Sequence, residues 1–280
     1  MIIRHLPDSL IDPGLEIQAI HLFDYQSSRN SEKNKNILRQ NAFIFLLEGS
    51  KEVYFGDQHQ VINPDSFLMM SAGNCLMTDK ISPQSNYHTV LFFFDQHILN
   101  RFIRTNNIVP AKKEANPLNV LKYDEYISSF VQSLLNARYI FAPLLNNFLE
   151  TKLHEFLYYL ISKIGSSFLC SLIATDSPRE NQFKQIIEMN SFKKLSIEEL
   201  AFLNNMSLST FKRTFSDVYQ TTPGKWLLKQ RLQFASMLLI KEGKRPIEIY
   251  EQLGFESLSS FIQAFKGEYG TTPKQFQSLN

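Results

Sequence analysis

Two short stretches of the chain carry polar side chains at a spacing that suits contact with a charged, hydrogen-bonding surface. Residues 206–215 read MSLSTFKRTF, and residues 256–265 read ESLSSFIQAF. Phenylalanines four residues apart share one face of a helix, so the hydroxyls and cations between them would point outward. Such groups contact phosphates and base edges. The pattern indicates nucleic-acid chemistry, although two helical hairpins that only pack are the alternative interpretation.

These stretches belong to a longer internal repeat. Residues 197–226 align with residues 247–276 at a constant offset of 50 without gaps, and 12 of the 30 pairs are identical. A repeat of this quality predicts one supersecondary unit built twice. The residues of the first copy that recur in the second are Ile197, Glu198, Leu203, Ser207, Leu208, Ser209, Phe211, Phe215, Tyr219, Thr221, Thr222 and Pro223.

Each copy is predicted to form a helix-turn-helix. In the first copy, a short helix at residues 197–203 precedes a tight turn, and Ser207 should cap the next helix by accepting from a free backbone N–H. In the second copy, Gly254 occupies the turn, where positive φ is wanted. A helix from Pro223 to about Ile240 would span roughly 27 Å. It would act as a strut between the units, near the ~34 Å repeat of B-DNA.

The composition restricts the class of protein only loosely. The chain has 29 basic and 27 acidic residues, and residues 178–280 hold 14 Lys or Arg against 10 Asp or Glu. This mild excess allows a nucleic-acid surface, but a mixed solvated surface explains it equally well. Cys75 and Cys170 lie in apolar surroundings and are expected to be buried free thiols. No stretch resembles a signal peptide or a membrane span, so a cytoplasmic protein without membrane contact is expected.

The first 95 residues are predicted to be rich in β-strands. Short apolar segments separated by turn signals are typical of a β-sandwich or a small barrel. The polar stretch 27–35 is predicted to be a loop. The predicted strands are residues 16–25, 41–47, 51–55, 60–63, 66–70, 74–80 and 87–94.

Beyond this region the hydrophobic period changes to that of helices. Apolar stripes at residues 127–135 and 145–164 predict two helices, with Gly165 as the stop of the second. The second stripe is wide. It could pack within the chain, or it could form a homodimer interface through residues 118–165. A boundary is expected at Thr175–Pro178. The predicted organisation is 1–110 for a regulatory domain, 111–175 for a helical linker, and 176–280 for a domain with helix-turn-helix units at about 197–218 and 247–268.

These motifs resemble those of the AraC/XylS family of bacterial transcription regulators. The resemblance covers about residues 180–278 and includes LSIEELA, S-x-S-x-F-x-R-x-F from Ser207, R-L-x-x-A-x-x-L-L from Arg231, and F-K-x-x-x-G-T-T-P at the end. It implies an α+β protein with an N-terminal cupin-like β-barrel or sandwich, a helical linker, and a C-terminal all-α domain with two helix-turn-helix motifs. It further implies a regulator of transcription that binds double-stranded DNA and works with RNA polymerase, and we expect it to be an activator.

The outward positions and the family motif together give the candidate DNA-binding residues. They are Ser207, Ser209, Thr210, Lys212, Arg213, Ser257, Ser259, Ser260, Ile262 and Gln263. Two positions depart from the family pattern, because Gln263 stands where Arg is usual and Tyr250 where Ala is usual. Gln can still pair with adenine but brings no charge, so the second unit is predicted to bind more weakly or less strictly. Candidate phosphate contacts, each equally explained as a solvated side chain, are Lys193, Lys194, Lys225, Lys229 and Arg231.

For the N-terminal domain two hypotheses stay open. The barrel could hold a small-molecule effector, or its own side chains could fill it so that it acts through protein contacts. Inward residues of a small barrel are normally core, so aromatic side chains are weak evidence for a ligand; the resemblance favours an effector. The candidate effector-binding residues are Phe43, Phe45, Tyr54, Phe67, Phe92 and Phe94.

Catalysis is not predicted. The six histidines form no His-x-His pair, so a metal site of the cupin type is not expected. The sequence shows no Gly-rich phosphate loop and no nucleophile elbow. The expectation is therefore a protein that is no enzyme and needs neither metal nor cofactor. The competing hypotheses are a protein that binds or sequesters a partner without DNA, and a cupin-type metal enzyme with a helical appendage.

Overall fold

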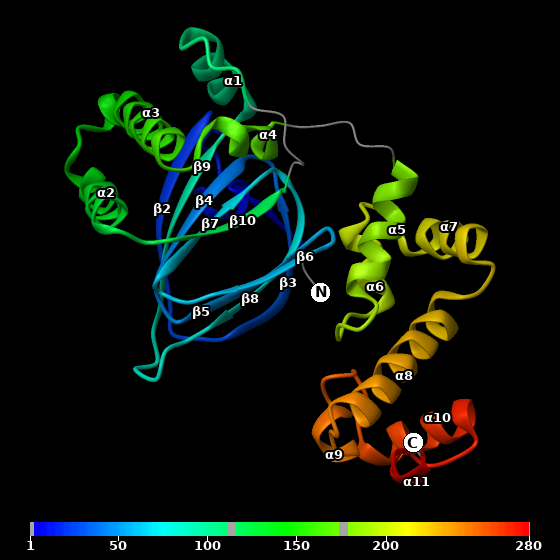
Figure 1. Ribbon diagram of the computed structural model, residues 1–280. Coiled ribbons are helices and arrows are strands. Elements are labelled where there is room, and N and C mark those ends of the chain that lie inside the picture. The colour runs from blue at the N-terminus through cyan, green and yellow to red at the C-terminus, as the bar shows by residue number, and fades with distance from the viewer. Residues whose placement is uncertain (1–2, 111–115, 174–178, 280) are drawn as a thin grey trace. The chain divides into compact units, whose positions relative to one another are not determined.

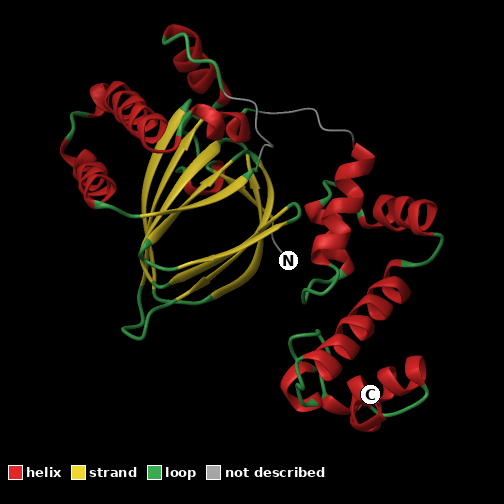
Figure 2. Ribbon diagram, viewed as in Figure 1, coloured by secondary structure: helices red, strands yellow, loops and turns green. Residues whose placement is uncertain are grey.

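The computed structural model describes residues 3–110, 116–173 and 179–279. The chain divides into two compact units, Met1–Ser177 and Pro178–Asn280. The first unit combines β-sheets with helices, and the second is built of helices (Figures 1 and 2). This is the predicted α+β class. The domain boundary expected at residues 175–178 lies outside the described residues.

The first unit is a β-sandwich. In its described part, one five-stranded sheet has the order β1-β3-β8-β5-β6, and a second five-stranded sheet has the order β10-β7-β4-β9-β2. The strands of the first sheet are β1 (Ile3–Leu6), β3 (Ser31–Leu38), β8 (Gly73–Lys80), β5 (Ser50–Phe55) and β6 (Gln58–Ile62). The strands of the second sheet are β10 (Leu118–Lys122), β7 (Ser66–Met70), β4 (Asn41–Glu48), β9 (Tyr87–Phe94) and β2 (Ile20–Ser27).

The second sheet is buried on both faces, which explains why its central strands are almost wholly apolar. Alternate side chains of a strand point to opposite faces. In β4, Ile44 belongs to the core between the two sheets, whereas Phe43 and Phe45 belong to a separate core on the outer face. Continuous apolar runs are what a sheet covered on both faces requires. The β4, β7 and β9 sequences therefore fit a sheet packed between a second sheet and a layer of helices.

Helices cover the outer face of this sheet (Figure 1). They are α1 (Gln96–Thr105), α2 (Glu125–Leu135), α3 (Leu145–Ile164) and α4 (Leu169–Leu172). The wide apolar stripe of α3 packs into the same core as Phe43 and Phe45. Five of its residues are buried there: Leu149, Leu153, Phe156, Leu157 and Leu160. Gly165, with φ of +78°, follows the last residue of α3 as predicted. Packing within the unit thus accounts for the stripe.

Strand β3 corrects the sequence-based expectation for the polar stretch 27–35. The prediction of a loop was wrong, because Ser31–Leu38 pairs antiparallel with β8 and parallel with β1. Its first half, SEKNK, carries no apolar alternation, so a hydrophobic pattern could not reveal it. Backbone pairing holds this segment in the sheet. The seven predicted strands are present, β7 and β9 with the predicted bounds and the others with shifted ends, whereas β1, β10 and helix α1 were not predicted.

The second unit consists of helices α5 to α11. These are α5 (Arg179–Asn190), α6 (Ile197–Leu203), α7 (Leu208–Tyr219), α8 (Pro223–Lys241), α9 (Pro246–Ile249), α10 (Leu258–Tyr269) and α11 (Pro273–Leu279). The long α8 follows the predicted strut closely. Within the described parts of both units, no helix is long and apolar enough to cross a membrane.

Candidate nucleic-acid interface

The first helix-turn-helix is formed by α6 and α7, and side-chain caps fix both starts. The Ser196 hydroxyl accepts from the Glu199 N–H at 3.1 Å, while the Glu199 carboxylate accepts from the Ser196 N–H at 2.8 Å. This reciprocal capping box satisfies two backbone donors that a helix start leaves free. Between the helices, Asn205 takes a positive φ of 55°, a conformation that Asn tolerates better than most residues. The turn is thus written in local sequence.

Helix α7 exposes a polar face opposite its buried phenylalanines. Phe211 and Phe215 are fully buried, whereas Ser209, Lys212 and Arg213 are exposed. The three exposed side chains lie at positions i, i+3 and i+4, so they share one face of the helix. They supply one hydroxyl and two cations at the exposed surface. This is the arrangement that the sequence predicted for the first recognition helix.

The hydroxyl groups at the start of α7 have another task. The Ser207 hydroxyl accepts from the Thr210 N–H at 3.2 Å and lies 2.8 Å from the Thr210 hydroxyl. In the second copy, Ser257 caps α10 by accepting from the Ser260 N–H at 3.1 Å. These four of the ten predicted DNA-binding residues thus take part in helix caps. They position the recognition helices, and the residues further along each helix carry the outward face.

The second helix-turn-helix repeats this design with a shorter first helix. Helix α9 spans only Pro246–Ile249, compared with seven residues in α6. Gly254 takes φ of +83° in the turn, as its residue type predicted. On α10, Ser259 and Gln263 are exposed and Ile262 is half-buried. The second face is therefore less charged at the two positions that hold Lys and Arg in the first copy.

The aromatic packing of the two copies is nearly the same. Phe211 and Phe215 have ring centroids 5.8 Å apart, and their counterparts Phe261 and Phe265 are 5.7 Å apart. The next pair along each helix, which ends in a tyrosine, measures 4.5 Å in the first copy and 4.6 Å in the second. The repeated residues thus build the fold twice. The sequence differences between the copies include the outward positions Lys212/Ile262 and Arg213/Gln263.

Lys266 shares the outward face of α10, and the sequence reasoning missed it. It follows Gln263 by three residues and Ile262 by four, and its side chain is exposed. The first copy has Ser216 at the matching position. The signal was present in the offset of 50, because Lys266 replaces a serine just where the second copy loses Lys and Arg. The second recognition helix therefore carries one cation, displaced by one turn.

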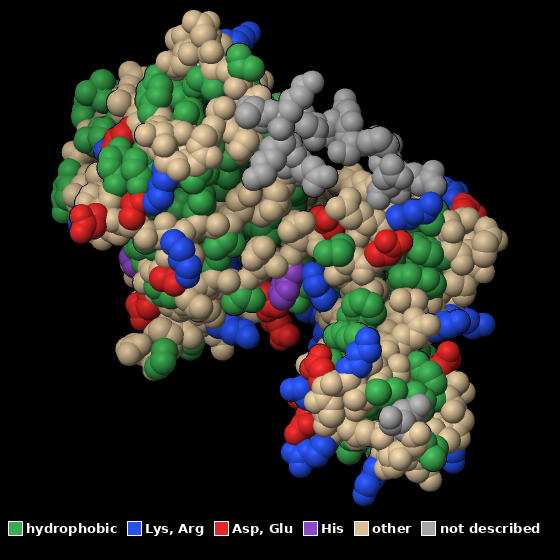
Figure 3. Space-filling model, in the orientation of Figure 1, with side chains coloured by type: hydrophobic (Ala, Val, Ile, Leu, Met, Phe, Trp, Pro, Cys, Tyr) green, Lys and Arg blue, Asp and Glu red, His purple; other side chains and the backbone are tan. Residues whose placement is uncertain are grey.

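The candidate phosphate contacts do not behave alike. Lys225 and Lys229 on α8 are exposed. Arg231 is not free to reach a phosphate, because its Nη2 donates to the carbonyls of Lys193 and Leu195 at 3.3 and 3.0 Å. Burial lowers the pKa of its guanidinium. The visible face of the second unit mixes basic and acidic side chains (Figure 3).

The candidate effector residues are not gathered inside the sandwich. The five phenylalanines lie on the outer face of the second sheet, under the helices, where Phe43 meets Phe94 at 5.2 Å and Phe156 of α3 at 5.0 Å. Each of the five is buried. Tyr54 is apart from them on the first sheet, stacked on His59 at 4.3 Å. The structure thus places Phe43, Phe45, Phe67, Phe92 and Phe94 in a filled helix-covered core and separates Tyr54 from them.

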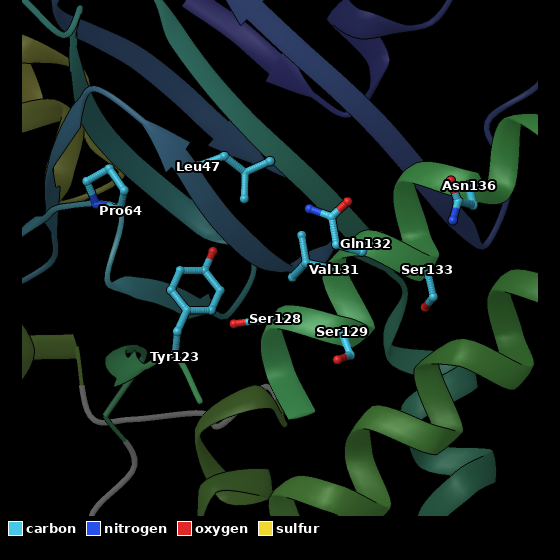
Figure 4. Close-up of a pocket in the computed structure, with 9 residues that line it drawn as sticks. All are labelled: Leu47, Pro64, Tyr123, Ser128, Ser129, Val131, Gln132, Ser133 and Asn136. Carbon is cyan, nitrogen blue, oxygen red and sulfur yellow. The ribbon is translucent and has the colours of Figure 1, made fainter. Parts of the chain in front are cut away.

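An open groove lies between α2 and the ends of neighbouring strands (Figure 4). Tyr123 lies in its wall, and its hydroxyl donates to the Leu46 carbonyl at 3.1 Å. Burial raises the pKa of the Tyr123 phenol. The other lining residues are Leu47, Pro64, Ser128, Ser129, Val131, Gln132, Ser133 and Asn136. The groove mixes hydroxyl, amide and apolar groups, and it does not include the aromatic residues that the sequence suggested.

No cluster of three His, Cys, Asp or Glu side chains that could hold a metal ion occurs in the described residues. Cys75 is a buried free thiol whose pKa burial raises to about 12. Cys170 is only half-buried, which corrects the expectation that both thiols are buried.

Two protein families match separate parts of the chain. The family described as the ExsA N-terminal regulatory domain matches residues 41–172, and the family described as the helix-turn-helix domain matches residues 200–278. Together they cover the sandwich from β4 onward, its helices, and most of the helical unit.

Individual relatives agree with these families. The virulence regulon transcriptional activator VirF of Yersinia enterocolitica is 28% identical over 176 residues, which is 62% of this chain and 62% of VirF. The chain therefore aligns with about three-fifths of the length of this relative. The RCS-specific HTH-type transcriptional activator RclR of Escherichia coli K12 is 37% identical over 94 residues, 34% of this chain and 33% of RclR.

Among solved structures, apo ToxT from Vibrio cholerae aligns with 92% of this chain and 96% of its own, at 15% identity and a TM-score of 0.42. The DNA-binding domain of AdpA, solved in complex with a target DNA, aligns with 37% of this chain and 93% of its own. Its identity is 24% and its TM-score is 0.34.

Proposed function

The chain belongs to the AraC/XylS family of transcription regulators, and we propose that it binds double-stranded DNA sequence-specifically through α7 and α10. The observation that supports this function is the duplicated helix-turn-helix, with a polar outward face on each second helix. Helix α8, which joins the copies, has 19 residues and so spans roughly 28 Å. A connecting helix of this length is comparable with the ~34 Å repeat of B-DNA, which suits two recognition helices that enter successive major grooves.

Within this proposal the residues divide into readers and caps. Lys212 and Arg213 contact bases or phosphates in the first half-site, and Arg213 is suited to a bidentate contact with guanine. Gln263 is suited to adenine and Ile262 to a thymine methyl group in the second. Ser209 and Ser259 supply a hydroxyl in each half-site. The residues Ser207, Thr210, Ser257 and Ser260 fix the helix starts and the register of the readers.

The experiment is a selection of DNA from a random pool by the full chain, followed by binding measurements at several salt concentrations. Binding to a selected sequence should weaken steeply between about 50 and 200 mM salt, because released counterions drive phosphate contact. The double variant Lys212→Ala/Arg213→Ala should lose most of this binding. A matched control, Arg4→Ala/Arg29→Ala, removes two exposed charges from the first unit and should retain it. A wild-type chain that enriches no sequence would refute the proposal, and so would a double variant that binds as well as the wild type.

We further propose that the protein activates transcription and contacts RNA polymerase when bound to a promoter. The relatives VirF and RclR are both named as transcriptional activators. A reporter gene placed behind a selected site should respond to the protein, and a decrease in its expression would contradict activation. The sandwich would control this activity by binding a small molecule or a protein. The groove beside α2 is an open feature of this unit that suits such contact.

A homodimer through residues 118–165 is part of the proposal but needs side chains other than the buried stripe of α3. Exposed apolar groups in this segment provide them. They are Tyr126, Tyr139, Phe141, Leu144, Tyr158 and Ile164. Sedimentation of the wild type and of a Tyr139→Ser/Phe141→Ser variant tests the interface. A wild type that stays monomeric at all concentrations would exclude it.

A further inference from the structure

Arg231 lies where the two helix-turn-helix units approach each other. It belongs to α8, whose buried residues from Leu232 to Leu239 are part of the core of the second helix-turn-helix. The N-terminal end of α8 instead packs on the first helix-turn-helix, because Trp226 contacts Phe215 at 5.7 Å between ring centroids. Arg231 thus stands at the changeover between the two packing partners of the strut.

The guanidinium of Arg231 holds the segment that leads into α6 of the first helix-turn-helix. Its Nη2 donates to the carbonyls of Leu195 at 3.0 Å and Lys193 at 3.3 Å. This segment directly precedes Ser196, the N-cap of α6. A partly desolvated cation forms strong hydrogen bonds to such carbonyls and is costly to leave unpaired. The contact therefore fixes where α6 begins relative to α8.

The same guanidinium packs on the turn of the second helix-turn-helix. A Cβ atom added at Gly254 would lie 3.2 Å from Nη1 and 3.4 Å from Cζ of Arg231, and 3.6 Å from Cγ of Lys194. Gly254 lies between α9 and α10 and takes φ of +83°. Glycine at this position thus serves two needs, the turn and the approach of Arg231. Lys194, which lies just before α6, reaches the same point. The two helix-turn-helix motifs therefore meet there with the guanidinium between them.

We propose that Arg231 is a positioning residue that fixes the angle between the two helix-turn-helix units and thereby the spacing of DNA half-sites that the protein accepts. This inference rests on the proposed function. Packing at each end of α8 attaches each unit to the strut, and Arg231 ties both units to one point on it. Arg suits this role better than Lys, because its planar fork can serve several partners at once.

The alternative is the phosphate contact that the sequence suggested for this residue. The two roles predict different results. A lost phosphate contact weakens binding to every DNA about equally and lowers the salt slope by about one. A lost positioning contact weakens binding only where both units must bind together, since the benefit of joining two modules depends on their geometry.

The test uses the full chain and a two-half-site sequence that the wild type selects from a random pool. Binding is measured to the intact site, to each half-site alone, and to sites with one or two base pairs inserted between the halves. Arg231→Ala should bind the intact site about tenfold more weakly, as expected for the loss of a charge-assisted hydrogen bond. Its affinity for single half-sites should change less than about threefold, and inserted base pairs should penalise it less than the wild type. The affinity of Arg231→Lys for the intact site should lie between that of the wild type and that of Arg231→Ala.

A second pair of variants guards against a change that merely unfolds the domain. Gly254→Ala brings a methyl group against the guanidinium and should also relax the spacing preference. Gly243→Ala is the matched control, because Gly243 has φ of +63° with nothing within 4 Å of an added Cβ. Both substitutions meet the same backbone cost, but only the first disturbs Arg231. Single half-site binding and thermal unfolding report on folding for each variant.

Three outcomes would overturn the inference. One is an equal loss of affinity on all probes with a lower salt slope, and another is an unchanged spacing preference in both Arg231→Ala and Gly254→Ala. The third is a relaxation of spacing in Gly243→Ala that matches the one in Gly254→Ala. If the wild type selects no DNA at all, the proposed function itself is wrong and the inference is overturned with it.

Discussion

Trp226 meets Phe215 edge to face, with ring centroids 5.7 Å apart and ring planes at 73°. The second copy repeats this contact with Phe276 and Phe265 at 5.3 Å and 76°. In each copy, the helix after the Thr-Thr-Pro motif returns an aromatic ring to the buried face of the recognition helix. Edge-to-face pairs of this kind stabilise beyond the area that they bury. The contact therefore closes each helix-turn-helix onto the helix that follows it.

Replacing Trp226 should destabilise the packing of the first helix-turn-helix. Trp226→Ala is expected to destabilise the C-terminal unit by about 2 kcal/mol, since the ring is half-buried and its stacking partners would be left exposed. Trp226→Phe should recover most of this loss, because the second copy uses Phe at the same position. Denaturant unfolding followed by far-ultraviolet circular dichroism measures both variants. Equal stabilities of the Ala and Phe variants would contradict a role for the aromatic contact.

Several helix ends of the helical unit could be predicted from the sequence, although α9 is shorter than its counterpart α6. The start and stop signals of this unit are local, as with the Ser196 and Ser207 caps and the positive φ at Gly254. The repeat gave a second copy of some of these signals, such as the serine cap at Ser207 and Ser257 and the Thr-Thr-Pro motif. Lys266 lies outside the S-x-S-x-F-x-R-x-F motif, so the motif did not mark it as an outward residue.

The sandwich was predicted less completely, for reasons that lie in tertiary packing. The polar first half of β3 has no hydrophobic alternation, and only its pairing with β1 and β8 makes it a strand. The alternation of Phe43 and Ile44 showed two faces but could not tell which face the helices cover. Arg231 appeared as a solvent-facing cation, because its carbonyl partners are 36 and 38 residues away in sequence. Long-range contacts of this kind are invisible to spacing arguments.

The two recognition helices should contribute unequally to DNA affinity. Arg213→Ala is expected to cost about 1–3 kcal/mol of binding free energy and to relax specificity in one half-site. Gln263→Ala should cost less, because an amide makes no charge-assisted contact. Fluorescence anisotropy on one selected DNA compares them directly. An equal loss from the two substitutions would contradict the asymmetry of the repeat.

Lys266 should provide the electrostatic contribution of the second helix-turn-helix to DNA affinity. Lys266→Ala is expected to reduce the slope of log affinity against log salt by about one, as for the loss of one phosphate contact. Lys274→Ala removes the same charge from α11, where the side chain is exposed but lies off the recognition helix. The slope of this control should stay close to that of the wild type. A slope that changes equally in both variants would mean that only net charge matters.

The buried pair of Lys51 and Asp79 should be important for the stability of the sandwich. The Lys51 side chain is 4% exposed and forms an ion pair with the Asp79 carboxylate, which also accepts from the Ser31 hydroxyl at 3.1 Å. Burial alone would lower the pKa of Lys51, but Asp79 and Tyr87 more than offset it and raise the pKa. Lys51→Ala leaves the carboxylate without its cation and should cost about 3–5 kcal/mol of unfolding free energy.

The double variant Lys51→Met/Asp79→Leu distinguishes a lost pair from a lost side chain. Replacing both charges by apolar groups of similar size removes the unpaired ion and should recover most of the stability. Chemical denaturation of the full chain compares the single and double variants. A double variant as unstable as Lys51→Ala would show that packing around Lys51, and not the uncompensated charge, decides the loss.

His154 should make the stability of the first unit depend on pH near neutrality. Its ring lies against Phe102 at 5.0 Å between centroids, and burial lowers its pKa, an effect that nearby Glu150 opposes and Arg101 reinforces. The folded state thus binds this proton less readily than the unfolded state, so stability should fall as the pH drops below about 6.5 toward the folded pKa. Because solvent reaches part of the ring, the loss should not exceed about 1 kcal/mol. Calorimetry at pH 7.5 and 5.5 should show a smaller decrease for His154→Gln than for the wild type. His97→Gln, which replaces an exposed histidine on α1, should show the same decrease in stability as the wild type. A smaller decrease in this control as well would mean that the pH dependence is not specific to His154.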